Sequence, residues 1–138
     1  MFYVSTLKFK DSVAAFKQLK AQIAARKFAP IYLLMGEESY FIDVLCDALS
    51  SSILSPAEQA FNQITVYGKD SDAGQIVNLC RQMPMMGSYQ VVVVREAQQM
   101  SKLDALSHYT SSPQQTTILV VCYKNKEQGR GIDKRTSF

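Results

Sequence analysis

The apolar residues along this chain recur with two periods, and segments of the two kinds alternate. Helical spacing predicts four helices: one capped by Asp11 or Ser12 that ends before Pro30, one over 39–51, one capped by Asp70 or Asp72 that ends near Gln82, and one over 101–109. Continuous or alternating apolar runs predict strands at 31–35, 61–67, 90–95 and 116–123.

Two of the predicted strands are apolar almost throughout. Segment 90–95 contains four consecutive valines, and segment 116–123 reads TTILVVCY, a pattern typical of strands buried on both faces. Such strands alternating with helices predict an α/β fold, a parallel sheet with helices on both faces. From Lys124 onward the apolar periodicity stops, so we expect one domain over 1–125 and a linker, or the truncated start of a second domain, over 126–138.

Composition fits a single globular domain, because 47% of the 138 residues are hydrophobic and 20% are charged. No apolar run approaches the roughly 18 residues that span a bilayer, so we expect a cytoplasmic protein. Charge is uneven: residues 1–30 carry six basic and one acidic side chains, 31–122 carry four and nine, and 123–138 carry five and two. The acidic middle argues against a domain whose body grips nucleic acid phosphates.

The three cysteines, Cys46, Cys80 and Cys122, are far apart in the sequence and lie in apolar surroundings. No pair has the spacing of a metal knuckle, and His108 is the one histidine that could join them as a ligand. We therefore expect no metal site and predict buried free thiols.

Segment 30–43, PIYLLMGEESYFID, has the layout of a nucleotide-binding strand, loop and helix. A working phosphate loop also needs a second glycine and a Lys followed by Ser or Thr, and these are missing. Its loop, formed by Gly36, Glu37, Glu38 and Ser39, presents two carboxylates where phosphate oxygens would have to approach, and like charges repel. We interpret this segment as a degenerate nucleotide loop. Any parallel α/β domain can also contain a strand, a Gly turn and a helix without that history.

A second unusual segment is 81–88, RQMPMMGS, which holds three of the six methionines in a connection where polar residues are the rule. Methionine fits irregular apolar pockets and is common on surfaces that bind other proteins. The alternative is that Met85 and Met86 fold back and fill the core at a strand entrance. The pattern alone leaves both readings open.

In their order and spacing, these segments resemble the amino-terminal domain of the delta subunit of the bacterial DNA polymerase III clamp loader. The resemblance covers nearly the whole chain and rests on the basic opening segment before 30–34, Gly36-Glu37-Glu38, Phe41-Ile42, Phe61-Asn62, the 82–86 turn before 91–95, and Ser112-Pro113 before 117–121.

The resemblance implies a RecA-like AAA+ domain without ATPase activity or a cofactor. It further implies a non-catalytic subunit of the DNA polymerase holoenzyme that binds the beta sliding clamp and favours its opening. By position, the clamp-binding residues are Gln82, Met83, Pro84, Met85 and Met86, with Met85 and Met86 as the apolar pair in place of the commoner Leu-Phe type. Further domains would join the other loader subunits, and DNA would be reached only indirectly, within the complex.

Two other classes of protein have the same predicted fold. An active nucleotide-binding ATPase would need a lysine after Gly36 and a strand-end acid, for which Glu96, after Arg95, is a poor substitute. A receiver-like module would need an acidic pocket, and the sequence does not show that Glu37, Glu38 and Glu96 form one. Magnesium-nucleotide titration tests the first class, and aspartyl phosphorylation tests the second.

Overall fold

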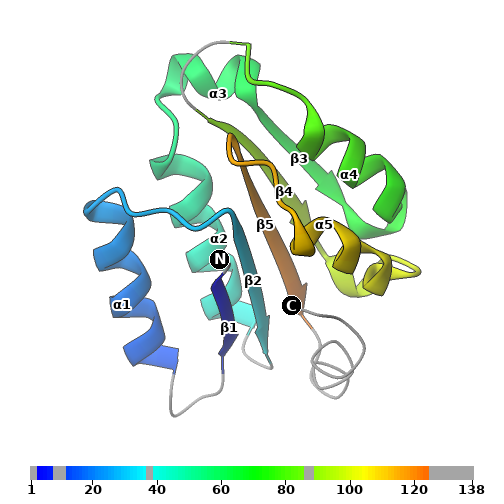
Figure 1. The fold of residues 1–138 in the computed structure, drawn as a ribbon. Coiled ribbons are helices and arrows are strands. Elements are labelled where there is room, and N and C mark those ends of the chain that lie inside the picture. Colours follow the sequence, from blue (N-terminus) through cyan, green and yellow to red (C-terminus); the bar gives the residue numbers. More distant parts are fainter. Residues whose placement is uncertain (1–2, 8–11, 37–38, 86–88, 125–138) are drawn as a thin grey trace.

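The computed structural model describes residues 3–7, 12–36, 39–85 and 89–124 (Figure 1). Its centre is a five-stranded sheet with the order β1-β2-β5-β4-β3, in which every neighbouring pair is parallel. The strands are β1 (Tyr3–Leu7), β2 (Ile31–Gly36), β3 (Gln63–Tyr67), β4 (Gln90–Arg95) and β5 (Thr117–Lys124). The predicted parallel α/β fold is confirmed, and β1 is an edge strand that the sequence analysis did not predict.

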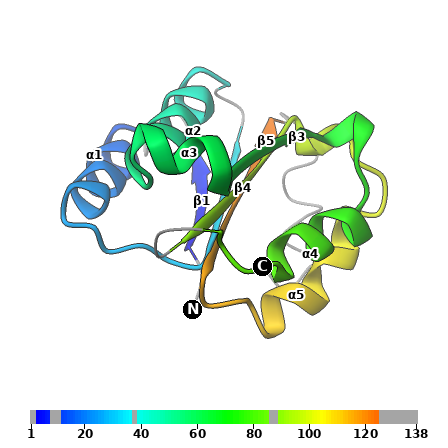
Figure 2. The same cartoon turned by 90° about the horizontal axis from the view of Figure 1, so that it is seen from above.

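Helices cover both faces of the sheet (Figure 2). They are α1 (Ser12–Ala24), α2 (Ser39–Ser52), α3 (Pro56–Asn62), α4 (Ala73–Arg81) and α5 (Ser107–Ser111), with short 3-10 helices η1 (Gly68–Asp70), η2 (Ala97–Gln99) and η3 (Leu103–Leu106). The α1 and α2 helices lie on one face, and α4 and α5 lie on the other. Within the described residues, no helix is long and apolar enough to cross a membrane.

The valine strand β4 shows why the central strands are apolar on both sides. Val91 and Val93 point into the cluster beneath α1 and α2, whereas Val92 and Val94 point into the cluster beneath α4 and α5, and all four are fully buried. Because successive side chains of a strand point to opposite faces, a strand covered by helices on both sides needs an apolar residue at every position.

The predicted strand at 61–67 is wrong at its start, since Phe61 and Asn62 close helix α3 and β3 begins at Gln63. A capping box forms this helix: the Ser55 hydroxyl accepts the Glu58 N–H, and the Glu58 carboxylate accepts the Ser55 N–H. The signal stands in the sequence as Ser55-Pro56-Ala57-Glu58, with proline at the first helical position. The alternation of apolar and polar residues over 61–67 favoured a strand, so the sequence analysis missed this helix.

Two further boundaries differ from the prediction. The helix expected over 101–109 begins only at Leu103, because Lys102 adopts a left-handed conformation with φ of 58° that is incompatible with a helix, and it consists of η3 followed by α5. Lys124, which the sequence placed in the tail, is the last residue of β5. The rest of that tail, 125–138, lies outside the described residues. Asp72, one of two predicted caps, accepts the Gln75 N–H and starts α4.

Candidate functional site

Because all five strands are parallel, the sheet has a carboxyl edge where every strand ends and an amino edge where every strand begins. The segment interpreted above as a degenerate nucleotide loop follows β2 at the carboxyl edge: Gly36 ends β2 and Ser39 begins α2. The predicted strand and helix on either side of this segment are therefore in place, while Glu37 and Glu38 lie outside the described residues. Ligands of parallel α/β sheets bind at this edge.

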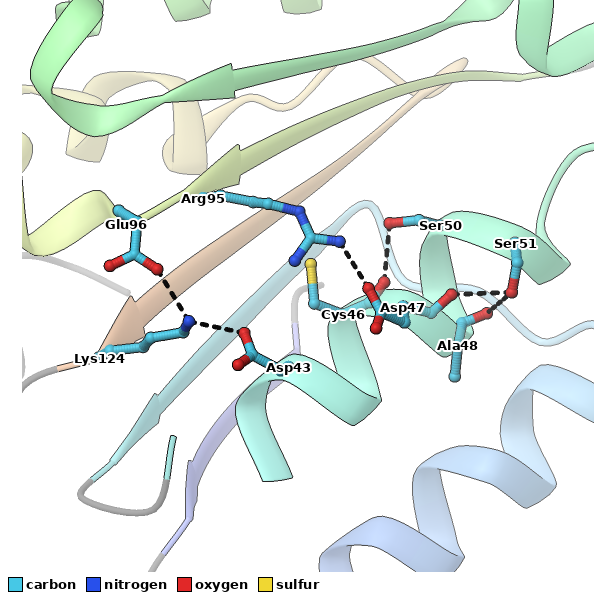
Figure 3. Close-up of polar contacts among 9 residues, drawn as sticks. All are labelled: Asp43, Cys46, Asp47, Ala48, Ser50, Ser51, Arg95, Glu96 and Lys124. Carbon is cyan, nitrogen blue, oxygen red and sulfur yellow. Dashed lines mark hydrogen bonds and ion pairs between the residues drawn. The ribbon is translucent and has the colours of Figure 1, made fainter. Parts of the chain in front are cut away.

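Ion pairs occupy the carboxyl edge beside α2 (Figure 3). Arg95, at the end of β4, contacts the Asp47 carboxylate of α2 at 2.7 Å. Lys124, at the end of β5, lies 2.7 Å from a carboxylate oxygen of Asp43 and 2.8 Å from one of Glu96. Both cations thus face carboxylates of the same chain rather than an open space for phosphate.

These contacts shift the pKa values of Glu96 and Lys124. The hydrogen bond from Lys124 lowers the pKa of Glu96, and the Gln98 side chain adds to the effect. Partial burial lowers the pKa of Lys124, but its bonds to Asp43 and Glu96 outweigh that effect and raise it. Among the described residues, no three His, Cys, Asp or Glu side chains are grouped so that they could hold a metal ion. Arg95 and Lys124 are thus both paired with carboxylates of the same chain.

Replacing Lys124 by Met is expected to destabilise the fold by up to about 1 kcal/mol at pH 7, the usual range for partly exposed ion pairs. Since the folded-state pKa of Glu96 is lowered, its stabilising contribution is present above its unfolded pKa of about 4.3 and is lost as pH falls through the folded value. Urea unfolding should therefore show wild type and Lys124→Met converging in stability as pH falls below the lowered folded-state pKa of Glu96. Lys69→Met, at an exposed position, is the control. A difference that stays constant as pH falls through that pKa would mean that the lysine stem acts by packing.

The methionine turn lies at the opposite, amino edge, between α4 and β4. The side chain of Met83 is 64% exposed and that of Met85 is 78% exposed. Gln82, the residue directly after α4, is also exposed, and Pro84 is half-buried. For Met85 the core-filling reading is therefore wrong. Met86 lies outside the described residues.

Polar side chains just before β3 and β5 hold this turn. On the β3 side, the Asn62 side-chain oxygen accepts the Met85 N–H at 3.0 Å. On the β5 side, the Gln114 side-chain amide donates to the Met83 sulfur at 3.4 Å, and the Thr116 hydroxyl lies 3.9 Å from the same sulfur. The turn is thus tied to the segments that enter the sheet, while the Met83 and Met85 side chains remain largely exposed.

The structure adds two residues to the amino edge, Phe61 and Asn62, which the sequence analysis had assigned to a strand. Phe61 is 57% exposed at the end of α3, and its neighbour Asn62 is buried and bonded to the turn. Of the large apolar side chains that are exposed, Phe61, Met83 and Met85 come from this edge. Recognition of the capping box at Ser55 would have placed Phe61 on a helix, although not beside the turn.

The cysteines form no site of their own. All three are buried and free, which confirms the predicted buried thiols. Burial raises the pKa of the Cys80 thiol to about 12, so that it stays protonated and packs as a small apolar group. The one histidine, His108, is exposed on α5.

The comparisons with known proteins point to one family. The family described as "DNA polymerase III, delta subunit" matches residues 32–134. Among solved structures, the Bacillus subtilis DNA clamp loader delta protein YqeN superposes with a TM-score of 0.70 at 18% sequence identity, covering 88% of this chain. The chain spans 40% of that protein's length. The search of curated proteins found no match.

The family match includes β2 and both edges of the sheet described above, and the structural likeness supports the same fold. The family match extends over more than half of the sequence. The chain therefore belongs to the DNA polymerase III delta subunit family.

Proposed function

We propose that this chain binds the beta sliding clamp through the 82–86 turn and favours opening of the ring during DNA replication. The observation that carries the proposal is the exposure of Met83 and Met85 on a turn that is anchored to the sheet. Outward methionines on a fixed backbone are suited to enter an apolar pocket on a partner. Gln82, exposed at the start of the turn, would be the polar anchor, and Met86 would complete the apolar pair.

The energetics require a surface larger than two methionines. Each fully buried methionine side chain contributes roughly 1.5 to 3 kcal/mol, whereas a micromolar complex needs about 8 kcal/mol beyond the cost of association. Further contact area is available at the same edge, where Met83 and Phe61 are exposed. We therefore expect the end of α3 to lie within the contact area.

Ring opening follows from differential binding and needs no catalytic residue in this chain. A subunit that binds the open clamp more tightly than the closed clamp shifts that equilibrium by the ratio of the two affinities. A tenfold preference is worth about 1.4 kcal/mol. In this proposal ATP is used elsewhere in the loader complex, and the remaining domains join the other subunits and reach DNA only indirectly, in the cytoplasm.

The carboxyl edge would be a degenerate nucleotide site of a RecA-like AAA+ domain. Two observations support this proposal. Gly36 is not followed by the Lys-Ser/Thr pair that binds phosphates. In addition, Arg95 and Lys124 are paired with carboxylates. A nucleotide would have to break these pairs before it gained any phosphate contact.

Magnesium-ATP is accordingly expected to leave the melting temperature unchanged at millimolar concentrations. A ligand that binds only the folded state stabilises it by RT ln(1 + [L]/Kd), so even a millimolar site would give a melting temperature that rises steadily with the logarithm of the ATP concentration above Kd. Thermal unfolding with and without nucleotide measures this directly, and magnesium sulfate at equal ionic strength is the control. A rise that grows with ATP concentration and is absent with magnesium sulfate would contradict the proposal and favour an active nucleotide-binding protein.

Calorimetric titration of the sliding clamp from the same organism with this chain tests the clamp-binding function. We expect saturable binding at micromolar concentrations with a negative heat-capacity change, the mark of apolar burial. If neither this chain nor a full-length protein that contains it binds the clamp at tens of micromolar, the proposal is wrong.

A further inference from the structure

We propose that Asn62 is the positioning residue of the clamp-binding turn: its side chain fixes the backbone at Met85 in the orientation that exposes the Met85 side chain. The inference rests on the proposed function, and it adds a residue outside the turn itself. Asn62 is 2% exposed and ends α3, and its side-chain oxygen accepts the Met85 N–H at 3.0 Å.

The chemistry of that bond makes asparagine suitable. A backbone N–H needs an acceptor, so the oxygen rather than the nitrogen of the amide must face Met85. Removal of the acceptor would leave the Met85 peptide partly buried without its hydrogen bond, a loss the turn relieves by rotating that peptide. Because the Cα–Cβ direction follows the backbone, such a rotation would redirect the Met85 side chain.

The position of Asn62 is itself fixed by the fold. The capping box at Ser55 starts α3, the Gln63 N–H bonds to the Gln59 carbonyl at its end, and Gln63 then pairs with Val91 of β4. Asn62 therefore stands beside the entrance to β4, which the turn precedes. A buried polar side chain, held by a capped helix and a strand, bonds to the most exposed methionine described in the turn.

Amide hydrogen exchange and clamp titration together test the inference. In the wild-type chain, the Met85 N–H should exchange slowly. In Asn62→Ala it should exchange at least about tenfold faster, while Val91 and Val93 in β4 stay protected, and clamp affinity should fall about tenfold, the fold-change expected for one hydrogen bond. Asn62→Asp keeps an acceptor oxygen but buries a carboxylate, so it should lower stability and yet leave the Met85 N–H exchanging more slowly than in Asn62→Ala.

Thr110→Val is the matched control, because it removes one hydrogen bond, from the Thr110 hydroxyl to the Ser107 carbonyl, from a buried side chain on α5. It should leave clamp affinity unchanged. The inference is overturned if Asn62→Ala binds as tightly as wild type, if Thr110→Val loses as much affinity, or if the wild-type Met85 N–H exchanges as fast as in an unfolded peptide. If neither the wild-type chain nor a full-length protein that contains it binds the clamp, the proposed function fails, and the exchange rates still decide whether Asn62 fixes the turn.

Discussion

Met85→Ala/Met86→Ala is expected to weaken clamp binding by at least about a hundredfold, since each buried methionine contributes roughly 1.5 to 3 kcal/mol and 1.4 kcal/mol is tenfold in affinity. Stability should hardly change, because Met85 is 78% exposed and exposed substitutions usually stay within about 0.5 kcal/mol. Calorimetric titration against the clamp gives the affinity, and urea unfolding of the same variants gives the stability.

Tyr67→Ala is the matched control for this pair. Tyr67 is another exposed large apolar side chain, at 47%, but it ends β3 at the carboxyl edge of the sheet. Its removal should leave clamp affinity unchanged. If both variants weaken binding equally, the contact surface is not confined to the amino edge. If the double variant binds like wild type, the turn is not the contact.

Gly68→Ala is expected to destabilise the fold by about 3 kcal/mol, near the upper end of the usual cost of overpacking, and to lower the melting temperature by about 10 °C. A Cβ atom at position 68 would lie 2.2 Å from the Glu96 carbonyl oxygen and 3.1 Å from the Met100 nitrogen. Both neighbours are backbone atoms, so no flexible side chain can move aside. The contact joins η1, after β3, to η2, after β4.

Gly74→Ala provides the comparison for Gly68. Gly74 is exposed in α4, where alanine is favoured over glycine by about 1 kcal/mol, and its added Cβ would meet only the Asp72 side-chain oxygen, at 3.2 Å. Its stability should therefore stay within about 1 kcal/mol of wild type. Thermal unfolding of the two variants separates a backbone clash from a general effect of losing glycine. Equal melting temperatures would mean that the 68–96 approach relaxes at little cost.

Local patterns in the sequence were sufficient for the class of fold. The four valines of β4 and the TTILVVCY run of β5 predicted buried central strands, and both are buried on each face, because alternate side chains meet helices on opposite sides. Asp72 and Pro84 likewise bounded α4 correctly, since capping and proline geometry act over a few residues. The missing Lys-Ser/Thr after Gly36 could also be noted directly from the sequence.

Competition between local signals misled the prediction in other places. At 61–67 an alternating pattern favoured a strand, but the capping box at Ser55 extends a helix through Asn62. The left-handed backbone at Lys102 moved the start of the helix expected over 101–109 to Leu103. Residue type does not predict that conformation, because lysine seldom adopts it. The edge strand β1 is held by pairing with β2, a contact between distant segments.

By itself, the sequence determined the alternation of helices and strands, the absence of a Lys-Ser/Thr pair after Gly36 and the cluster of methionines at 83–86, since each is a matter of local spacing or residue type. Only the tertiary structure decided that Met83 and Met85 face outward, that Asn62 bonds to the turn from 23 residues away, and that Arg95 and Lys124 face carboxylates of α2 and of Glu96. Burial and pairing are set by which distant segments meet, and the order of strands in the sheet brings those segments together.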